Sequence, residues 1–350
     1  MTTARPARAP RPARGSPQIR RAVALGGGHG LSVTLRALVQ VAGDVTAVVG
    51  VADDGGSSGR IRDELGGLPP GDLRMALCAL AGPDPVAQTW ARVFATRFGG
   101  DGALAGHAVG NLVLAALTQV LADPEQALRH AGELLGARGR VLPVSEVPLR
   151  IIARVQPSAG GELVQLHGQA AIGSMLGRVD TMWLEPADPP VTPSVARLLA
   201  ELDEGDLLVL GPGSWFSSVA PHLLMPGVSQ ALRSSRATRV LVLNLAAGPG
   251  ETAGMDPAAH LHALARLDLG LQLDVVVVDR RHGSDADKSG AGKPSAAIPS
   301  AGNPAESALR AAARHLGASL LVADLATPGG SVHDPARLAQ TLVASWEGHR

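Results

Sequence analysis

The chain has 350 residues, and its 31 basic side chains are balanced by 31 acidic ones. A formal net charge of zero gives no overall field that would steer the protein to nucleic acid or to an anionic membrane. Aromatic residues make up only 2% of the chain and tyrosine is absent, which argues against the stacking platforms of single-stranded nucleic-acid binders. The single cysteine, Cys78, excludes a disulfide framework and a cysteine-rich zinc site.

The beginning of the chain differs in composition from the rest. Residues 1–20 alternate alanine, proline and arginine without an acidic residue, and such a segment cannot bury enough apolar surface to fold. We expect a disordered tail, and a nucleic-acid-binding arm is the less favoured alternative. The start has no apolar stretch typical of a signal peptide, and no apolar run reaches the roughly 18 residues of a membrane span. The sequence therefore predicts a cytoplasmic protein with no membrane span and no nucleic-acid partner.

From residue 21 onward, short apolar runs alternate with helical patterns. The first half predicts strands at 22–25 and 45–51, and helices at 31–41, 72–81, 84–97, 107–122 and 124–136. The second half predicts strands at 207–210, 239–245, 273–278 and 319–324, and helices at 217–225, 227–235, 256–269, 305–316 and 334–346. Repeated strand–helix units indicate a Rossmann-like α/β fold with three layers (α/β/α) around a mainly parallel sheet.

Residues 141–185 interrupt this rhythm. Apolar runs at 149–155 and 162–166 flank a Ser-Ala-Gly-Gly turn, a pattern typical of a hairpin, and another strand is expected at 179–184. We interpret the segment as a small antiparallel element inserted into a single domain that covers residues 21–346. A second irregular stretch, 282–304, is rich in Gly, Ser, Ala and Pro and is expected to be a mobile surface loop.

The most informative motif follows the first predicted strand. Gly26-Gly27-Gly28-His29-Gly30 has four glycines in five residues, and glycine lets backbone N–H groups curl around an anion where a helix begins. A dinucleotide fingerprint would need glycine where Leu31 or Val33 stands, and the Gly-Lys-Ser/Thr of a P-loop is absent. The loop therefore favours phosphate binding of neither familiar type, and a tight turn without a ligand is the alternative.

A second loop, Asp53-Asp54-Gly55-Gly56-Ser57-Ser58-Gly59, follows the next predicted strand. Nucleotide-binding α/β folds place a carboxylate for a ribose hydroxyl near this point. Two adjacent acids beside a phosphate would repel it unless they face a sugar, an arginine or a cation such as Mg²⁺. We therefore expect Asp53, Asp54, Ser57 and Ser58 to contact the ligand, and a Mg²⁺ on the two acids stays open, as does a solvated turn.

Further polar residues stand at comparable places along the chain. Asp72 follows a Pro-Pro-Gly turn, where it either caps the next helix or contacts the ligand, and Arg74 lies just inside that helix. Asn111 interrupts an apolar helical run and is either a satisfied core amide or a ligand contact. Strand ends in the second half carry Gly213, Ser214, Asn244 and Glu251. No Ser-His-Asp order and no metal-ligand spacing emerges, so we predict no catalytic residue.

Six segments carry a resemblance to a known family. They are Gly-Gly-Gly-His-Gly-Leu-Ser at 26–32, Ala-Asp-Asp-Gly-Gly-Ser-Ser-Gly-Arg at 52–60, Leu-Pro-Pro-Gly-Asp-Leu-Arg at 68–74, Gly-Asn-Leu at 110–112, Gly-Pro-Gly-Ser at 211–214 and Pro-Gly-Glu-Thr at 249–252. This combination resembles the gluconeogenesis factor family (YvcK type), which is related to the 2-phospho-lactate transferases (CofD type). The resemblance runs from about residue 21 to residue 346.

The resemblance implies a cytoplasmic, Rossmann-like protein that binds UDP-N-acetylglucosamine and has no established catalytic reaction. It also implies a role in carbon-source-dependent cell shape and in peptidoglycan regulation, exercised through protein partners that the sequence does not identify, and we expect a homo-oligomer. A phosphate-ester transferase of the CofD type, with Mg²⁺ on Asp53 or Asp54 and phosphate on the glycine loop, is the alternative.

Carried over by position, the resemblance places residues in three parts of a site. The phosphate site would be lined by Gly27, Gly28 and His29; the nucleotide–sugar cleft by Asp53, Asp54, Ser57 and Ser58; and the far wall by Asn244 and Glu251. One departure affects ligand identity. The stretch Val332-His333-Asp334 stands where the family often has Arg-His-Asp, and the missing arginine would weaken or alter the binding of the nucleotide-sugar.

Overall fold

The computed structural model describes residues 18–158, 160–245, 256–266, 270–283, 304–330 and 332–349. Its centre is a parallel sheet of seven strands in the order β10-β9-β8-β7-β1-β2-β3. The strands are β1 (Ile19–Gly26), β2 (Ala42–Val49), β3 (Arg140–Pro143), β7 (Leu207–Leu210), β8 (Thr238–Val242), β9 (Val275–Asp279) and β10 (Ser319–Ala323). The order runs outward from the β1–β7 pair in both directions, so the topological switch point lies between these two strands.

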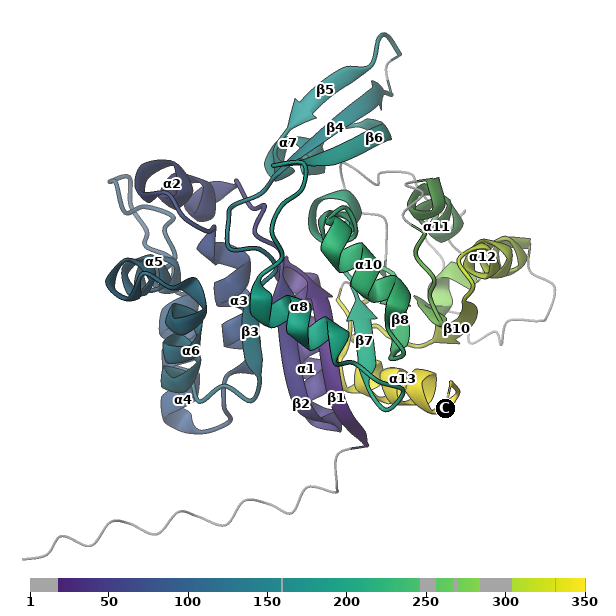
Figure 1. Ribbon diagram of the computed structural model, residues 1–350, viewed down its shortest axis with the longest axis horizontal. Coiled ribbons are helices and arrows are strands. Elements are labelled where there is room, and N and C mark those ends of the chain that lie inside the picture. The colour runs from purple at the N-terminus through teal and green to yellow at the C-terminus, as the bar shows by residue number, and fades with distance from the viewer. Residues whose placement is uncertain are drawn as a thin grey trace, which may run out of the picture.

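Helices cover both faces of this sheet (Figure 1). One face carries α1 (Gly28–Val41), α3 (Pro70–Leu80) and α13 (Pro335–Glu347), and α4 (Pro85–Ala95), α5 (Val109–Leu121) and α6 (Pro124–Leu134) contribute to the same buried cluster. The opposite face carries α8 (Pro193–Ala200), α9 (Ala220–Leu223), α10 (Pro226–Ser234), α11 (Pro257–Arg266) and α12 (Pro304–His315). This arrangement confirms the predicted Rossmann-like fold with three layers.

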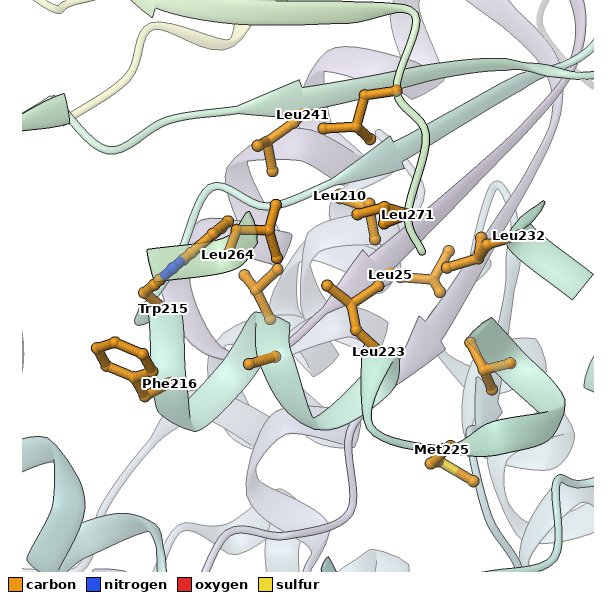
Figure 2. Packing of buried hydrophobic residues seen from close by; sticks show 14 of the residues in the cluster. Leu25, Leu210, Trp215, Phe216, Leu223, Met225, Leu232, Leu241, Leu264 and Leu271 are labelled. Atoms are coloured by element: carbon orange, nitrogen blue, oxygen red, sulfur yellow. The ribbon is translucent and has the colours of Figure 1, made fainter. Parts of the chain in front are cut away.

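The alternation of side chains along each strand explains why there are two cores. Ala22 and Ala24 of β1 join the cluster on the α1 side, whereas Val23 and Leu25 join the cluster on the α9 side, as the two-residue period of a strand requires. Figure 2 shows Leu25, Leu210 and Leu241 of three neighbouring strands gathered with leucines of α9 and α11. Continuous apolar runs are therefore needed in the central strands, because both of their faces are buried.

A second, antiparallel sheet stands off the main body (Figure 1). It has the order β5-β4-β6, with β4 (Arg150–Pro157), β5 (Val164–His167), β6 (Gly177–Glu185) and the short helix α7 (Gln169–Ser174). This is the inserted antiparallel element that the sequence predicts. Its start needs correction, because residues 140–143 form β3, which pairs with β2 in the main sheet.

Several other boundaries differ from the sequence predictions. Helix α2 (Gly56–Leu65), α8 and the single-turn π-helix Trp215–Val219 were not predicted as such, and β1 already begins at Ile19, inside the segment expected to be a tail. The predicted tail otherwise lies outside the described residues, as does most of the predicted loop 282–304. Within the described part of the chain, no helix is long and apolar enough to cross a membrane.

Candidate functional site

The glycine loop leads directly from β1 into α1 at the switch point of the sheet. Gly27 is the residue before α1 and has an extended backbone, and Gly28 has φ +59°, a conformation that favours glycine. Gly27 supplies no side-chain cap, and the first turn of α1 itself holds no acidic residue. The Gly28 N–H is taken by the Asp72 carboxyl, so the positive end of the helix dipole and the next backbone N–H groups, from His29 onward, are what the loop offers to an anion.

The loop after β7 approaches the glycine loop so closely that only glycine fits. A Cβ atom added to Gly30 would lie 1.9 Å from the carbonyl oxygen of Pro212. The β7 loop is held from its other side by Asn244, whose Oδ1 accepts from the Gly213 N–H at 2.9 Å while its Nδ2 donates to the Gly213 oxygen at 2.8 Å. The two loops thus form one wall, as expected where the carboxyl ends of β1 and β7 meet.

A cavity of about 1200 Å³ opens beside these loops. Seven of the predicted site residues line it: Gly27, Gly28, His29, Arg74, Gly213, Ser214 and Asn244. Glu251, predicted for the far wall, lies outside the described residues. Among the residues that the structure describes, the lining is rich in glycine and arginine and carries no aspartate or glutamate, which suits an anionic ligand.

The two adjacent acids of the second loop point to different neighbours. Asp53 accepts from the Gly55 N–H at 3.0 Å, and Asp54 accepts from the Ala170 N–H of α7 at 2.9 Å. A Cβ added to Gly168 would lie 1.7 Å from Asp54 Oδ2, so this carboxylate packs tightly against the inserted element. Asp53 and Asp54 therefore contact different segments of the chain, and a Mg²⁺ on this pair stays a prediction.

Ser57, Asn111 and Arg74 form one buried chain of hydrogen bonds. Arg74 Nε donates to Asn111 Oδ1 at 2.9 Å, Asn111 Nδ2 donates to Ser57 Oγ at 3.0 Å, and Ser57 Oγ lies 3.1 Å from Nδ1 of His107. These contacts join α2, α3 and α5 and satisfy the amide of Asn111 within the protein. Of the two interpretations that the sequence left open for Asn111, the structure shows the satisfied core amide, which here orients an arginine of the cavity.

Ser58 and Asp72 lie directly behind the glycine loop. Ser58 Oγ accepts from the Gly71 N–H at 3.0 Å at the start of α3. Asp72, in the first turn of that helix, accepts from the backbone N–H of Gly28, and a Cβ added to Gly27 would lie 2.2 Å from its Oδ2. Burial, together with the charge of Asp53, raises the pKa of Asp72 from 3.8 to about 7.

The sequence did not single out several polar residues of the cavity. Arg36 of α1, Arg97 after α4 and His333 before α13 all line it. A usable signal existed for Arg36, since it is the one arginine in a helix that otherwise has no acidic or basic residue besides His29. Burial lowers the pKa of His333 to about 4, so its ring is neutral at physiological pH.

Comparisons with known proteins agree on the family. The sequence model of the 2-phospho-L-lactate transferase CofD family matches residues 22–311. The chain is 50% identical to a Mycobacterium leprae protein over 91% of this chain and 84% of that protein, and 48% identical to a Mycobacterium tuberculosis protein over 91% and 88%. Both relatives are provisionally named gluconeogenesis factors.

A solved structure resembles the whole domain as well. The crystal structure of a UPF0052-family protein from Bacillus halodurans matches this chain with a TM-score of 0.76 and 29% sequence identity, and the match covers 93% of this chain and 99% of the Bacillus chain. A protein of Halalkalibacterium halodurans named gluconeogenesis factor is 36% identical over 73% of this chain and 76% of its own length.

Proposed function

The chain belongs to the gluconeogenesis factor family, which is related to the CofD transferases, and from that premise we propose that it is a regulatory protein that binds a nucleotide-sugar. The ligand we propose is UDP-N-acetylglucosamine, held in the cavity beside the glycine loop. In this proposal the protein senses the ligand and does not convert it. The observation that carries the proposal is the glycine loop at the start of α1, which lines a large cavity together with three arginines.

The geometry supports an anionic ligand of nucleotide-sugar size. The cavity volume of about 1200 Å³ is ample for it, since pockets of about 300–1000 Å³ enclose drug-sized molecules. His29 would offer its backbone N–H to the diphosphate, and the Asn244 side chain holds the opposite loop in place. No general base paired with a nucleophile is evident among the described cavity residues, which favours binding without turnover.

Calorimetry with UDP-N-acetylglucosamine tests the placement of the ligand. His29 is exposed in the first turn of α1, so His29→Glu adds a carboxylate at the proposed phosphate position with little disturbance of the fold. We expect His29→Glu to weaken binding at least ~10-fold by charge repulsion, whereas the neutral control His29→Gln stays within ~3-fold of wild type. Equal affinities of His29→Glu and His29→Gln would refute the placement.

The transferase alternative is favoured by one specific observation. After burial, the charge of Asp53 is the next cause of the raised pKa of Asp72, and carboxylates beside phosphates are the donors that Mg²⁺ binds. Incubation with Mg²⁺, nucleotide-sugars and phospholactate acceptors tests this alternative, with released nucleotide measured by chromatography. Turnover that is abolished by Asp53→Asn would support the transferase, and binding without product would support the sensor.

The proposal includes a cytoplasmic location, carbon-source-dependent control of cell shape and wall synthesis, and action through protein partners or self-association. These elements rest on the family resemblance. The exposed surface offers a place for association on α5, which has no charged residue and whose Val120 is 81% exposed. Deletion of the gene should alter cell shape on gluconeogenic carbon sources and leave it normal on sugars; equal shapes in both media would contradict this role.

A further inference from the structure

Three arginines from different elements meet at the cavity. Arg36 lies on α1, Arg74 on α3 and Arg97 just after α4, and all three line the cavity. Among the described residues, no carboxylate lies within ion-pair distance of any of them. Arg74 is only 6% exposed. Burial lowers its pKa and the charge of Asp72 opposes only part of that fall, so a bound anion would stabilise the buried guanidinium.

Electrostatic effects link the three arginines in pairs and through Cys78. Cys78 also lines the cavity, and the charges of Arg74 and Arg36 both oppose the rise in the pKa of its thiol that burial causes. The charge of Arg97 contributes to lowering the pKa of Arg74, after burial as the larger cause. Arg97 and Arg74 carry like charges and repel each other. An oxyanion bound between them would offset that repulsion.

Neutral groups, which form no ion pair, hold two of the arginines in place. Arg74 is fixed by its hydrogen bond to Asn111, which the buried chain through Ser57 holds in turn. Arg97 donates from Nη1 to the backbone oxygen of Gly106 at 2.8 Å. The arrangement is therefore preorganised for an anion, since little side-chain entropy remains to be lost on binding.

This cluster is separate from the phosphate position at the glycine loop. Arg36 lies eight residues after Gly28 on the same helix, which places it about 12 Å further along the helix axis. A phosphate bound at the start of α1 does not reach that far. The cavity of about 1200 Å³ also exceeds the ~1000 Å³ upper end of typical small-molecule pockets, so it has room for a second ligand.

We propose that Arg36, Arg74 and Arg97 form a second anion subsite, which binds a phosphate-bearing small molecule alongside the nucleotide-sugar. The proposal rests on the proposed function only for the identity of the first ligand. The arginine cluster itself can be tested without that ligand. Arginine suits this role, since its planar guanidinium binds phosphate oxygens in pairs. Regulation by two ligands in one cavity would let the protein report on two metabolites together.

Inorganic phosphate is the probe for the experiment, titrated by calorimetry into the full-length protein saturated with UDP-N-acetylglucosamine. Arg36 and Arg97 are exposed, so the double variant Arg36→Gln/Arg97→Gln should fold normally. We expect phosphate binding in wild type and at least ~10-fold weaker binding in the double variant. The control Arg92→Gln removes an exposed arginine of α4 that is not among the cavity residues, and it should change phosphate affinity less than ~2-fold.

A second arm separates failure of this proposal from failure of the proposed function. Phosphate is titrated into His29→Glu without any nucleotide-sugar, where the glycine loop is blocked but the arginine cluster is intact. Retained binding in this variant supports the subsite even if the nucleotide-sugar does not bind at all. Loss of binding in His29→Glu, displacement of phosphate by UDP-N-acetylglucosamine, absence of phosphate binding, or equal affinities in the double variant and Arg92→Gln would each overturn the proposal.

Discussion

Asp72 is packed against Gly27 so tightly that a Cβ atom on the glycine would lie 2.2 Å from the carboxylate Oδ2. The same carboxyl accepts the N–H of Gly28, and its pKa is raised to about 7 by burial and by Asp53. An acid that changes charge near neutral pH therefore lies behind the proposed phosphate loop. Its ionised form would oppose a bound phosphate, and its protonated form would not.

We predict that Asp72 makes stability fall as the pH rises from about 4 to about 7. In this window the folded protein holds a proton that the unfolded chain has released, since the pKa is about 7 in the fold and 3.8 outside it. The free energy of unfolding falls by at most ~4 kcal/mol over this range, since each pKa unit corresponds to about 1.36 kcal/mol. His222 and His333, with pKa values lowered to about 4, act in the opposite direction between about pH 4 and 6.5.

The comparison of wild type with Asp72→Asn isolates this effect, because both histidines are present in both proteins. Urea unfolding at pH 5 and pH 8 should show Asp72→Asn gaining stability relative to wild type at the higher pH. The affinity of wild type for UDP-N-acetylglucosamine should also fall from pH 6 to pH 8, and this dependence should be flattened in the variant. Parallel pH profiles of the two proteins would contradict the assignment.

A second prediction concerns the opposite end of the sheet. Asp206 precedes β7 and is fully buried, and it accepts hydrogen bonds from Arg20 and Arg21 of β1 and from the N–H of Asp203. Removal of its charge takes away the one buried carboxylate that both arginines share, although Arg20 keeps Asp203 and Arg21 keeps Glu201. Breaking a buried pair costs about 3–5 kcal/mol. Because Arg20 is largely exposed, we expect Asp206→Asn to lose about 3 kcal/mol, near the low end of that range.

The control for this prediction is Asp203→Asn, because the Asp203 carboxylate pairs with Arg20 at the surface. Exposed pairs contribute less than ~1 kcal/mol. Chemical unfolding should separate the two variants, and calorimetry should find UDP-N-acetylglucosamine affinity unchanged in both, since β7 begins at the end of the sheet away from the crevice. A loss of affinity in Asp206→Asn without a loss of stability would contradict this assignment.

The sequence predicts the central sheet well because the central strands are buried on both faces and read as continuous apolar runs. Residues 207–210 were predicted as a strand and form β7 exactly within those bounds. Helix α2 was missed because its first turn holds Gly56, Ser57, Ser58 and Gly59, all poor helix formers. A tertiary contact stabilises it instead, since Ser58 Oγ accepts from the N–H of Gly71. Gly59 is needed for a local reason, because a Cβ there would lie 2.2 Å from the backbone oxygen of Asp54.

The sequence predicts where the candidate site lies, because it shows which strand ends converge. Glycine loops identify the crevice from the chain alone, because parallel strands bring their carboxyl ends together. The convergence of strand ends does not predict in which direction each side chain points. Asp53 and Asp54 are neighbours in sequence yet bond to different elements, and Arg97 reaches the cavity only because the backbone oxygen of Gly106 fixes it. Such contacts depend on segments distant in the chain.

A third prediction tests the contact between the two loops. Gly30→Ala places a methyl group 1.9 Å from the Pro212 oxygen, so the β1 and β7 loops must separate. We expect a loss of about 1–3 kcal/mol of stability, the range for overpacking, and weaker binding of UDP-N-acetylglucosamine. Gly99→Ala is the matched control, since nothing lies within 4 Å of an added Cβ there and its φ is not in the left-handed region. Similar effects of both substitutions would refute the role of the contact.

The last prediction concerns Val332, a position where the family resemblance leads us to expect an arginine. Val332 is 58% exposed and lines the cavity, and its backbone oxygen accepts from the N–H of Thr327 at 2.9 Å and from the hydroxyl of Thr327 at 3.2 Å. The side chain of residue 332 therefore extends from a backbone that is held in place, beside the proposed ligand. Val332→Arg adds a cation there and should tighten UDP-N-acetylglucosamine binding about 5-fold at low salt, equivalent to ~1 kcal/mol for one charge-assisted contact.

The neutral variant Val332→Gln separates charge from side-chain length, and it should stay within ~2-fold of wild type. The gain of Val332→Arg should shrink as the salt concentration rises from 0.01 M to 1 M, because the Debye length falls from about 30 Å to about 3 Å. Calorimetry at both concentrations measures this. If the arginine leaves the affinity unchanged at low salt, the diphosphate does not lie near residue 332, and the ligand must bind deeper against the α1 loop.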